Sequence, residues 1–212
     1  GGMRDVAIII PTITPERAWT VGHEASAQAG LCAETLLCED VARWGFTRTV
    51  NQGLRQVQDD QDALILNDDV SDFPDGWLAH LSERLHSAGD VGMVGPAGDV
   101  TTVETRHWTP AYTRQQRGVI EVNHLSFWCV LLRRELLTEL GPLDEAYIHY
   151  ASDFDYCDRA RARGWRLLLD FDVALTHDLA GSGTQHGWRG HDLSLYQYRR
   201  RKAGNPWPMH RT

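Results

Sequence analysis

Several common signatures of nucleotide binding and catalysis are missing from this sequence. The first apolar run is followed by Pro-Thr-Ile-Thr-Pro at residues 11–15 and not by Gly-x-Gly-x-x-Gly, so dinucleotide binding of the Rossmann kind is not expected. The Gly-x-x-x-x-Gly-Lys-Ser/Thr pattern of a P-loop is absent, as is a Gly-x-Ser-x-Gly elbow. Any nucleotide site must therefore be built from other residues.

Cysteines and long apolar runs are also scarce. The four cysteines show neither Cys-x-x-Cys spacing nor a short Cys/His cluster, so we expect free buried thiols in a reducing compartment at Cys32, Cys38, Cys129 and Cys157. No apolar run approaches the roughly 20 residues that span a bilayer, and no signal peptide is visible. We therefore expect a cytoplasmic protein without an integral membrane segment. Gly1-Gly2 before Met3 is typical of a scar from tag removal.

The charge balance does not indicate a generally basic, nucleic-acid-binding surface. The 21 Lys and Arg against 29 Asp and Glu give a net charge of −8 with His neutral. One local basic run, residues 199–202, has two interpretations: it attracts phosphates, or it is a solvated helix end. With 212 residues, 42% of them hydrophobic and 24% charged, the composition is that of one soluble globular domain.

Strands and helices alternate along the first half of the chain. Apolar runs predict strands at 6–10, 35–38, 63–66 and 91–94, and apolar spacing predicts helices at 15–29, 46–58 and 77–86. The second half is more mixed, with a loop or hairpin at 101–117, a strand or two within 119–133, helices at 134–140, 152–163 and 189–202, and strands at 166–169 and 173–176. The alternation predicts an α/β fold with a largely parallel sheet, whose ligands bind at the carboxyl ends of the strands.

Acidic residues follow two of these strands, Glu39-Asp40 after one and Asn67-Asp68-Asp69 after another. Mg²⁺ and Mn²⁺ commonly take one or two protein carboxylates together with substrate phosphates, so the second cluster is a candidate metal site. An Asx turn that ends the strand explains it equally well.

Two further positions have a chemical and a structural interpretation. Asp153 and Asp155 lie near the start of a predicted helix. Asp153 is either a general base or, like Asp155, a carboxylate that complements the positive end of the helix. His177 ends a predicted strand before a Gly/Ser stretch. It is either a metal or phosphate ligand or a structural histidine. Because residues 180–184 are rich in glycine, they could close over a diphosphate as a lid.

Six stretches occur in a specific order: VAIIIPT (6–12), GFTRTVNQGL (45–54), ALILNDDV (63–70), DVGMVGP (90–96), LLRRELLTELGPLDEAYIHYASDFDYCDRARARGWRLL (131–168) and LTHDLAGSGT (175–184). In this order they resemble family 2 glycosyltransferases of the GT-A fold, in particular rhamnosyltransferase-like members. The resemblance implies one domain over residues 3–212 with a mostly parallel central sheet flanked by helices. Residues 3–100 would form the nucleotide-sugar-binding half, 101–190 the acceptor and catalytic half, and 191–212 a C-terminal helix and tail.

The resemblance also implies residue roles. Asp69 would bind a divalent metal, Mn²⁺ or Mg²⁺, that bridges the donor diphosphate, and His177 would complete this site. Asp153 would be the general base. The donor nucleoside and sugar would contact Pro11, Thr12, Arg48, Asn51, Asp68 and either Glu39 or Asp40. The acceptor would meet aromatic faces, for which the candidates are Trp108, Tyr112, His124 and Trp128.

Three features depart from the family pattern. Ser152 replaces the glutamate that usually precedes the catalytic aspartate, residues 39–45 are compressed, and Phe127-Trp128 replace small residues. Phe127 is the better candidate for an ordinary core residue.

The resemblance predicts an inverting, metal-dependent transfer of a hexosyl or deoxyhexosyl group to a hydroxyl acceptor. A UDP-sugar donor is favoured, with dTDP and GDP as alternatives. The acceptor stays open among a lipid-linked saccharide, a protein, a small molecule and a modified nucleic-acid base, the last not indicated by any feature. The second hypothesis is a catalytically weak binding module, which Ser152 favours and the joint presence of Asp69, Asp153 and His177 disfavours. A nucleotidyltransferase would need a Gly-rich basic loop that residues 11–17 lack.

Overall fold

The computed structural model describes residues 4–98, 116–178 and 187–204. Its centre is a 7-stranded sheet in the order β2-β1-β3-β7-β5-β8-β6. The strands are β1 (Asp5–Thr12), β2 (Ala33–Glu39), β3 (Gln61–Leu66), β5 (Val91–Ala97), β6 (Val119–Val122), β7 (Cys129–Leu132) and β8 (Arg166–Ala174). All run in one direction except β6 and β7, which are antiparallel to their neighbours. This confirms the predicted α/β fold with a mostly parallel sheet.

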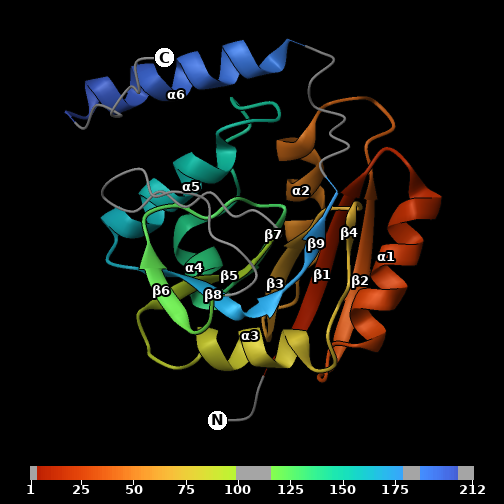
Figure 1. Cartoon of the computed structure of the whole chain (residues 1–212). Helices are drawn as coiled ribbons and strands as arrows, with labels where there is room; N and C mark the ends of the chain where they lie inside the picture. Colours follow the sequence, from red (N-terminus) through yellow and green to blue (C-terminus); the bar gives the residue numbers. More distant parts are fainter. Residues whose placement is uncertain (1–3, 99–115, 179–186, 205–212) are drawn as a thin grey trace.

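Helices cover both faces of the sheet (Figure 1). They are α1 (Pro15–Ala27), α2 (Phe46–Leu54), α3 (Trp77–Leu85), α4 (Arg134–Leu140), α5 (Ser152–Ala162) and α6 (Trp188–Lys202). Ile8 and Leu64 pack with α1 and α3 in one core cluster, whereas Ile65 packs with α2, α4 and α5 in another. Because both faces of β1 and β3 are buried, these strands are continuous apolar runs in the sequence.

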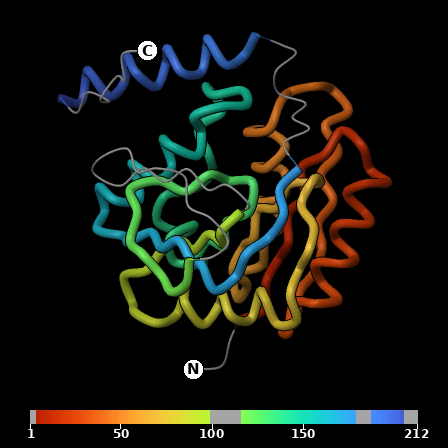
Figure 2. The backbone as a smooth tube through the Cα atoms, viewed as in Figure 1, coloured from red at the N-terminus to blue at the C-terminus, as the bar shows by residue number. Residues whose placement is uncertain are grey.

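A small second sheet and the last helix lie near the edge toward which β1, β2 and β3 run. The strands β4 (Val70–Ser71) and β9 (Thr176–His177) pair antiparallel, so the segment after β3 lies beside the segment after β8 (Figure 2). Helix α6 lies at the same end of the molecule, above α5 (Figure 1). Residues from distant parts of the chain are thereby collected at the carboxyl edge of the sheet.

Two predicted strand boundaries are wrong for identifiable reasons. Strand β5 continues through Gly95-Pro96 to Ala97, and a register shift against β8 between Pro96 and Ala97 accommodates the proline. Strand β8 is continuous where two strands were predicted, because Asp170 interrupts the apolar run in the sequence but is buried in the structure beside His80 and Arg84. Helix α2 is also shorter than predicted and ends at Leu54.

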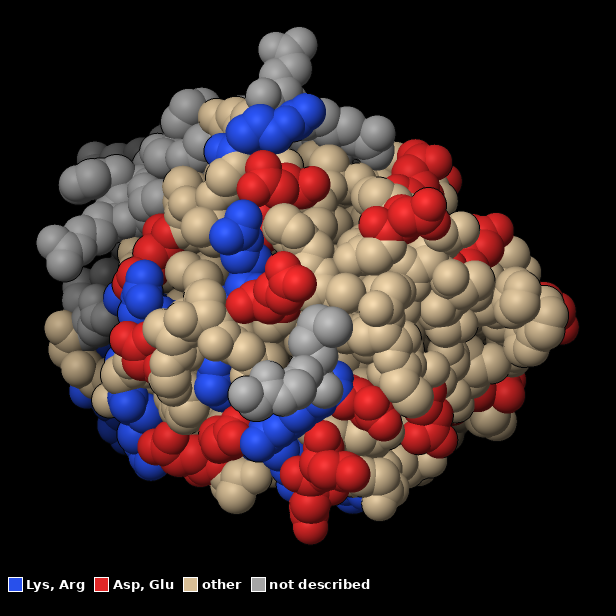
Figure 3. Space-filling model, turned by 90° about the horizontal axis from the view of Figure 1, so that it is seen from below, with Lys and Arg blue, Asp and Glu red and all other residues tan. Residues whose placement is uncertain are grey.

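Three other expectations concern thiols, membrane and charge. Cys38, Cys129 and Cys157 are buried free thiols, but Cys32 is exposed. Among the described residues, no helix is both long and apolar enough to cross a membrane. On the face opposite α6, basic and acidic side chains intermingle on the left and in the centre of the view, and the right part carries acidic side chains only (Figure 3).

Candidate active site

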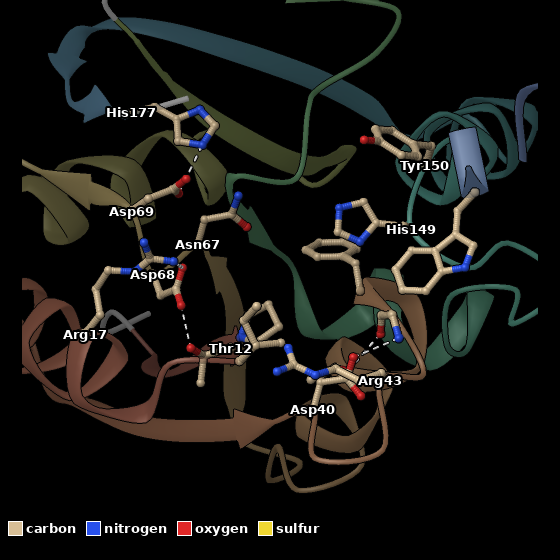
Figure 4. A pocket seen from close by; sticks show the side chains of 16 residues that line it. Thr12, Arg17, Asp40, Arg43, Asn67, Asp68, Asp69, His149, Tyr150 and His177 are labelled. Atoms are coloured by element: carbon tan, nitrogen blue, oxygen red, sulfur yellow. Dashed lines mark hydrogen bonds and ion pairs between the residues drawn. The ribbon is translucent and has the colours of Figure 1, made fainter. Parts of the chain in front are cut away.

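A cavity opens where β1, β2 and β3 end, as expected for a mostly parallel sheet (Figure 4). It has a carboxylate end and an aromatic end. The carboxylate end comprises Thr12, Arg17, Asn67, Asp68, Asp69 and His177, and the aromatic end comprises Asp40, Arg43, Gly45, Phe46, Thr49, His149, Tyr150 and Trp188, with Pro11 and Ile13 also lining the cavity. Of the residues predicted from sequence, the structure brings together Pro11, Thr12, Asp40, Asp68, Asp69 and His177.

Asp68 is held by two side chains at the carboxylate end. It accepts hydrogen bonds from the Thr12 hydroxyl and from Nη2 of Arg17, the latter at 2.7 Å. Arg17 lies in the first turn of α1, and the sequence interpretation did not select it. Its position just after the predicted helix start, beside the end of β1, was the available signal. This end of the cavity thus carries the guanidinium of Arg17 beside its carboxylates.

Asp69 and His177 meet because β4 pairs with β9, which sets Val70 opposite His177. Nε2 of His177 lies 3.2 Å from Oδ1 of Asp69. The Trp128 ring stacks on the His177 ring with centroids 4.9 Å apart and an interplanar angle of 10°. The sheet pairing and the stacking together fix the imidazole beside the carboxylate.

The donor set at Asp69 fits a divalent metal. Oδ1 of Asp69 is buried and makes no hydrogen bond within the described part of the chain, where Nε2 of His177 is its ion-pair partner. A carboxylate is the ligand type that suits Mn²⁺ and Mg²⁺, and the adjacent imidazole nitrogen offers a second ligand atom. Asp69 and His177 would hold the ion, leaving its other positions to phosphate oxygens and water.

A second cluster, His80, Asp170 and Asp172, could also bring three ligand atoms to a metal. There, however, Arg84 already contacts both carboxylates, with Nε 3.0 Å from Asp170 and Nη2 3.2 Å from Asp172. The guanidinium supplies the positive charge that a metal would bring, so this cluster is explained as an ion-pair network between α3 and β8.

The aromatic end is built on a tight loop after β2. Oδ1 and Oδ2 of Asp40 accept hydrogen bonds from the backbone N–H of Trp44 and Gly45 at 2.7 and 2.8 Å. The Phe46 ring meets His149 edge-on at 6.0 Å, and the Trp188 ring lies 5.9 Å from His149. Asp40 is buried and lines the cavity, whereas Glu39 is exposed and does not. The geometry therefore favours Asp40 where the sequence left both open.

Other predicted site residues lie outside the cavity lining. Nε of Arg48 pairs with Glu145 at 3.4 Å, and buried Asn51 exchanges hydrogen bonds with the backbone of Leu143 at 2.9 and 3.0 Å. His124 is buried, with Nε2 3.0 Å from Asp158. Trp108 lies outside the described residues, and its role stays a prediction.

Asp153 is the second residue of α5, three residues after Tyr150, and is not among the described residues that line the cavity. Its Oδ1 accepts a hydrogen bond from the N–H of Phe154 at 2.9 Å. Burial raises the pKa of Asp153 above that of an ordinary aspartate, because the charged form loses hydration. A raised pKa makes a carboxylate a stronger proton acceptor, which suits a general base.

The fold is that of GT-A glycosyltransferases. It is similar to GalNAc-T7 solved with UDP, GalNAc and Mn²⁺ (TM-score 0.64, 13% identity, 92% of this chain and 47% of that chain). It is also similar to the mannosyltransferase PcManGT of Pyrobaculum calidifontis, in complex with GDP-Man and Mn²⁺ (TM-score 0.62, 16% identity, 98% and 67%), and to A197 from STIV (TM-score 0.57, 12% identity, 82% and 86%).

In sequence, the chain is similar to N-acetylglucosaminyl-diphospho-decaprenol L-rhamnosyltransferase of Mycobacterium tuberculosis, with 30% identity over 111 residues. The match covers 51% of this chain but only 36% of the relative's length. No model of a protein family matches the chain. Fold and sequence together confirm the resemblance to glycosyltransferases and the GT-A architecture that the sequence predicted.

Proposed function

We propose that this domain transfers a sugar from a nucleoside diphosphate sugar to a hydroxyl acceptor. The observation that carries the proposal is Asp69, whose buried Oδ1 faces His177 at the end of β3 inside the cavity. A divalent metal bound there would offset the negative charge that develops on the leaving diphosphate. Arg17 and Thr12 hold Asp68 beside it, ready to meet the donor sugar or ribose.

The two ends of the cavity suit two parts of the donor. The diphosphate would lie at the carboxylate end, and the nucleoside between Asp40 and the rings of Phe46, His149 and Trp188. Asp153 would take the proton of the acceptor hydroxyl, and a base opposite the leaving group gives inversion. UDP is the first nucleotide to test, with dTDP and GDP next.

The comparisons support this choice of substrates. The two similar enzyme structures contain UDP or GDP-mannose with Mn²⁺. The M. tuberculosis relative is a rhamnosyltransferase named for a diphospho-decaprenol acceptor, which supports testing a lipid-linked saccharide first. We place the reaction in the cytoplasm, where nucleotide sugars are made.

A thermal-shift screen of nucleoside diphosphates, each with and without Mn²⁺, tests the donor site. A ligand that binds only the folded state raises the melting temperature by mass action. We expect one diphosphate to stabilise the protein only with metal, and Asp69→Ala to abolish the shift. Asp75→Ala removes an exposed carboxylate of the following turn and should leave the shift intact. The absence of any shift in the wild type would sink the proposal.

Turnover separates the enzyme from a binding module, the alternative that Ser152 favours. Metal-dependent release of free nucleoside diphosphate from the sugar nucleotide, lost in Asp153→Asn, supports the enzyme. Tight binding without any release would favour the module.

A further inference from the structure

The segment 148–150 contributes His149 and Tyr150 to the aromatic end of the cavity, and one buried carboxylate from another helix holds its backbone. Asp192 of α6 is fully buried, with 0% exposure. Its Oδ1 accepts a hydrogen bond from the N–H of Ile148 at 3.0 Å, and its Oδ2 accepts from His149 and Tyr150 at 2.8 Å each. Three successive backbone donors thus converge on one side chain.

This convergence requires an unusual local backbone. The next residue, Ala151, has a left-handed φ of 60°, which costs free energy for a residue with a Cβ. On the other side, the carbonyl of Ile148 accepts a hydrogen bond from Thr47 N–H at the start of α2, at 3.1 Å. Without Asp192, three part-buried N–H groups would lose their acceptor, and the segment would relax.

Other residues of α6 anchor the helix to the rest of the molecule, so this anchoring does not depend on Asp192 alone. Arg199 pairs with Asp144 at 2.6 Å and Arg200 with Asp158 at 3.1 Å. Neither arginine lines the cavity within the described chain, whereas Trp188 in the first turn of the same helix does. The helix therefore has a cavity-lining residue at its start and ion-pairing residues near its end.

We infer that Asp192 is a positioning residue, which holds segment 148–150 so that His149 and Trp188 form the wall that receives the nucleoside of the donor. The inference rests on the proposed function and assigns α6 to the donor site. The contacts of Asp192 do not reach the carboxylate end, where Asp69 and His177 lie. Binding of the nucleoside part should therefore depend on Asp192, and binding of the diphosphate part should not.

The test compares two probes, UDP and inorganic pyrophosphate, each titrated with Mn²⁺ present. Asp192→Asn keeps the size of the side chain but replaces one acceptor oxygen by an NH₂ group that faces N–H donors. We expect the affinity for UDP to fall roughly tenfold or more and the affinity for pyrophosphate to stay unchanged. Amide hydrogen exchange should accelerate at residues 148–150.

Arg199→Gln is the matched control, because it breaks another charged contact of α6 outside the cavity. It should keep both affinities. If Asp192→Asn does not fold, Asp192→Ser retains one acceptor and takes its place. Equal losses for UDP and pyrophosphate, or behaviour identical to Arg199→Gln, would overturn this inference alone. A wild type that binds neither probe would overturn the proposed function and this role with it.

Discussion

At the scale of single residues, the carboxylate end depends on how the ring of His177 is held. Trp128 was predicted as an acceptor contact, and the structure stacks it on His177 with centroids 4.9 Å apart. The backbone carbonyl of Trp128 also accepts a hydrogen bond from Asn67 N–H at 2.7 Å, so the tryptophan is coupled to the acidic segment itself. A residue that orients a metal ligand affects metal affinity without touching the metal.

We therefore expect Trp128→Ala to weaken Mn²⁺ binding roughly tenfold, because residues behind metal ligands typically contribute that much. Trp128→Phe preserves an aromatic face over the imidazole and should retain most of the affinity. Mn²⁺ titration in the presence of UDP measures the effect. Unchanged Mn²⁺ affinity together with a raised KM for the acceptor would instead support the original acceptor role.

At the scale of elements, the loop between β2 and α2 must pass very close to segment 148–150. Gly45 precedes α2 with a φ of 92°, and a Cβ at this position would lie 2.5 Å from the carbonyl oxygen of Ile148. Its N–H also donates to Asp40. Glycine is needed both for the backbone conformation and for the approach of the two loops.

Gly45→Ala should accordingly lower the free energy of unfolding by about 1–3 kcal/mol and weaken UDP binding, since it pushes the two walls of the aromatic end apart. Gly89→Ala is the control, because a Cβ there meets nothing within 4 Å. Urea unfolding and UDP titration of both variants provide the comparison. Equal stability of the two variants would contradict this account of the loop contact.

The elements that sequence predicted well are those with local signals. The run Val6–Ile10 and the helix start at Thr14-Pro15 are read directly from apolar runs and capping residues, and both lie where expected. The boundaries of β5 and β8 failed because the surroundings decide them: Pro96 is tolerated by a register shift, and Asp170 by partners on α3. Tertiary contacts override local preference at such positions.

The residues of the candidate site also fall into those that the sequence predicts and those that only tertiary contacts place there. Asp68 and Asp69 directly follow a buried strand, so their place at the carboxyl edge of the sheet was predictable from sequence. His149 and Trp188 were not, because they reach the cavity through contacts between chain segments roughly 40 residues apart or more. A signal existed for His149-Tyr150, two aromatic rings just before the helix of Asp153, but nothing local identifies Asp192 as their anchor.

At the scale of the whole molecule, three carboxylates hold α6 and the segment beneath it. The pKa values of all three, Asp144, Asp158 and Asp192, are lowered in the folded protein. Burial alone would raise the pKa of Asp192, but hydrogen bonds from His149, Tyr150, His191 and Ile148 outweigh it and lower the pKa. The pKa values of Asp144 and Asp158 are lowered as well: burial opposes this, and hydrogen bonds and the charges of Arg199 and Arg200 prevail.

These shifts predict acid sensitivity of the α6 contact. A carboxylate with a depressed pKa in the folded state stabilises the fold fully above its unfolded pKa of about 3.9, and this contribution is lost as pH falls through the folded value. We therefore expect the free energy of unfolding from urea titrations to be steady near neutral pH and to drop below about pH 4. Asp158→Asn removes one of the three groups and should be less stable at neutral pH but show a shallower decline in acid. An unchanged slope in this variant would mean that other carboxylates govern acid unfolding, and that α6 is held mainly by packing of Tyr196 against Phe154.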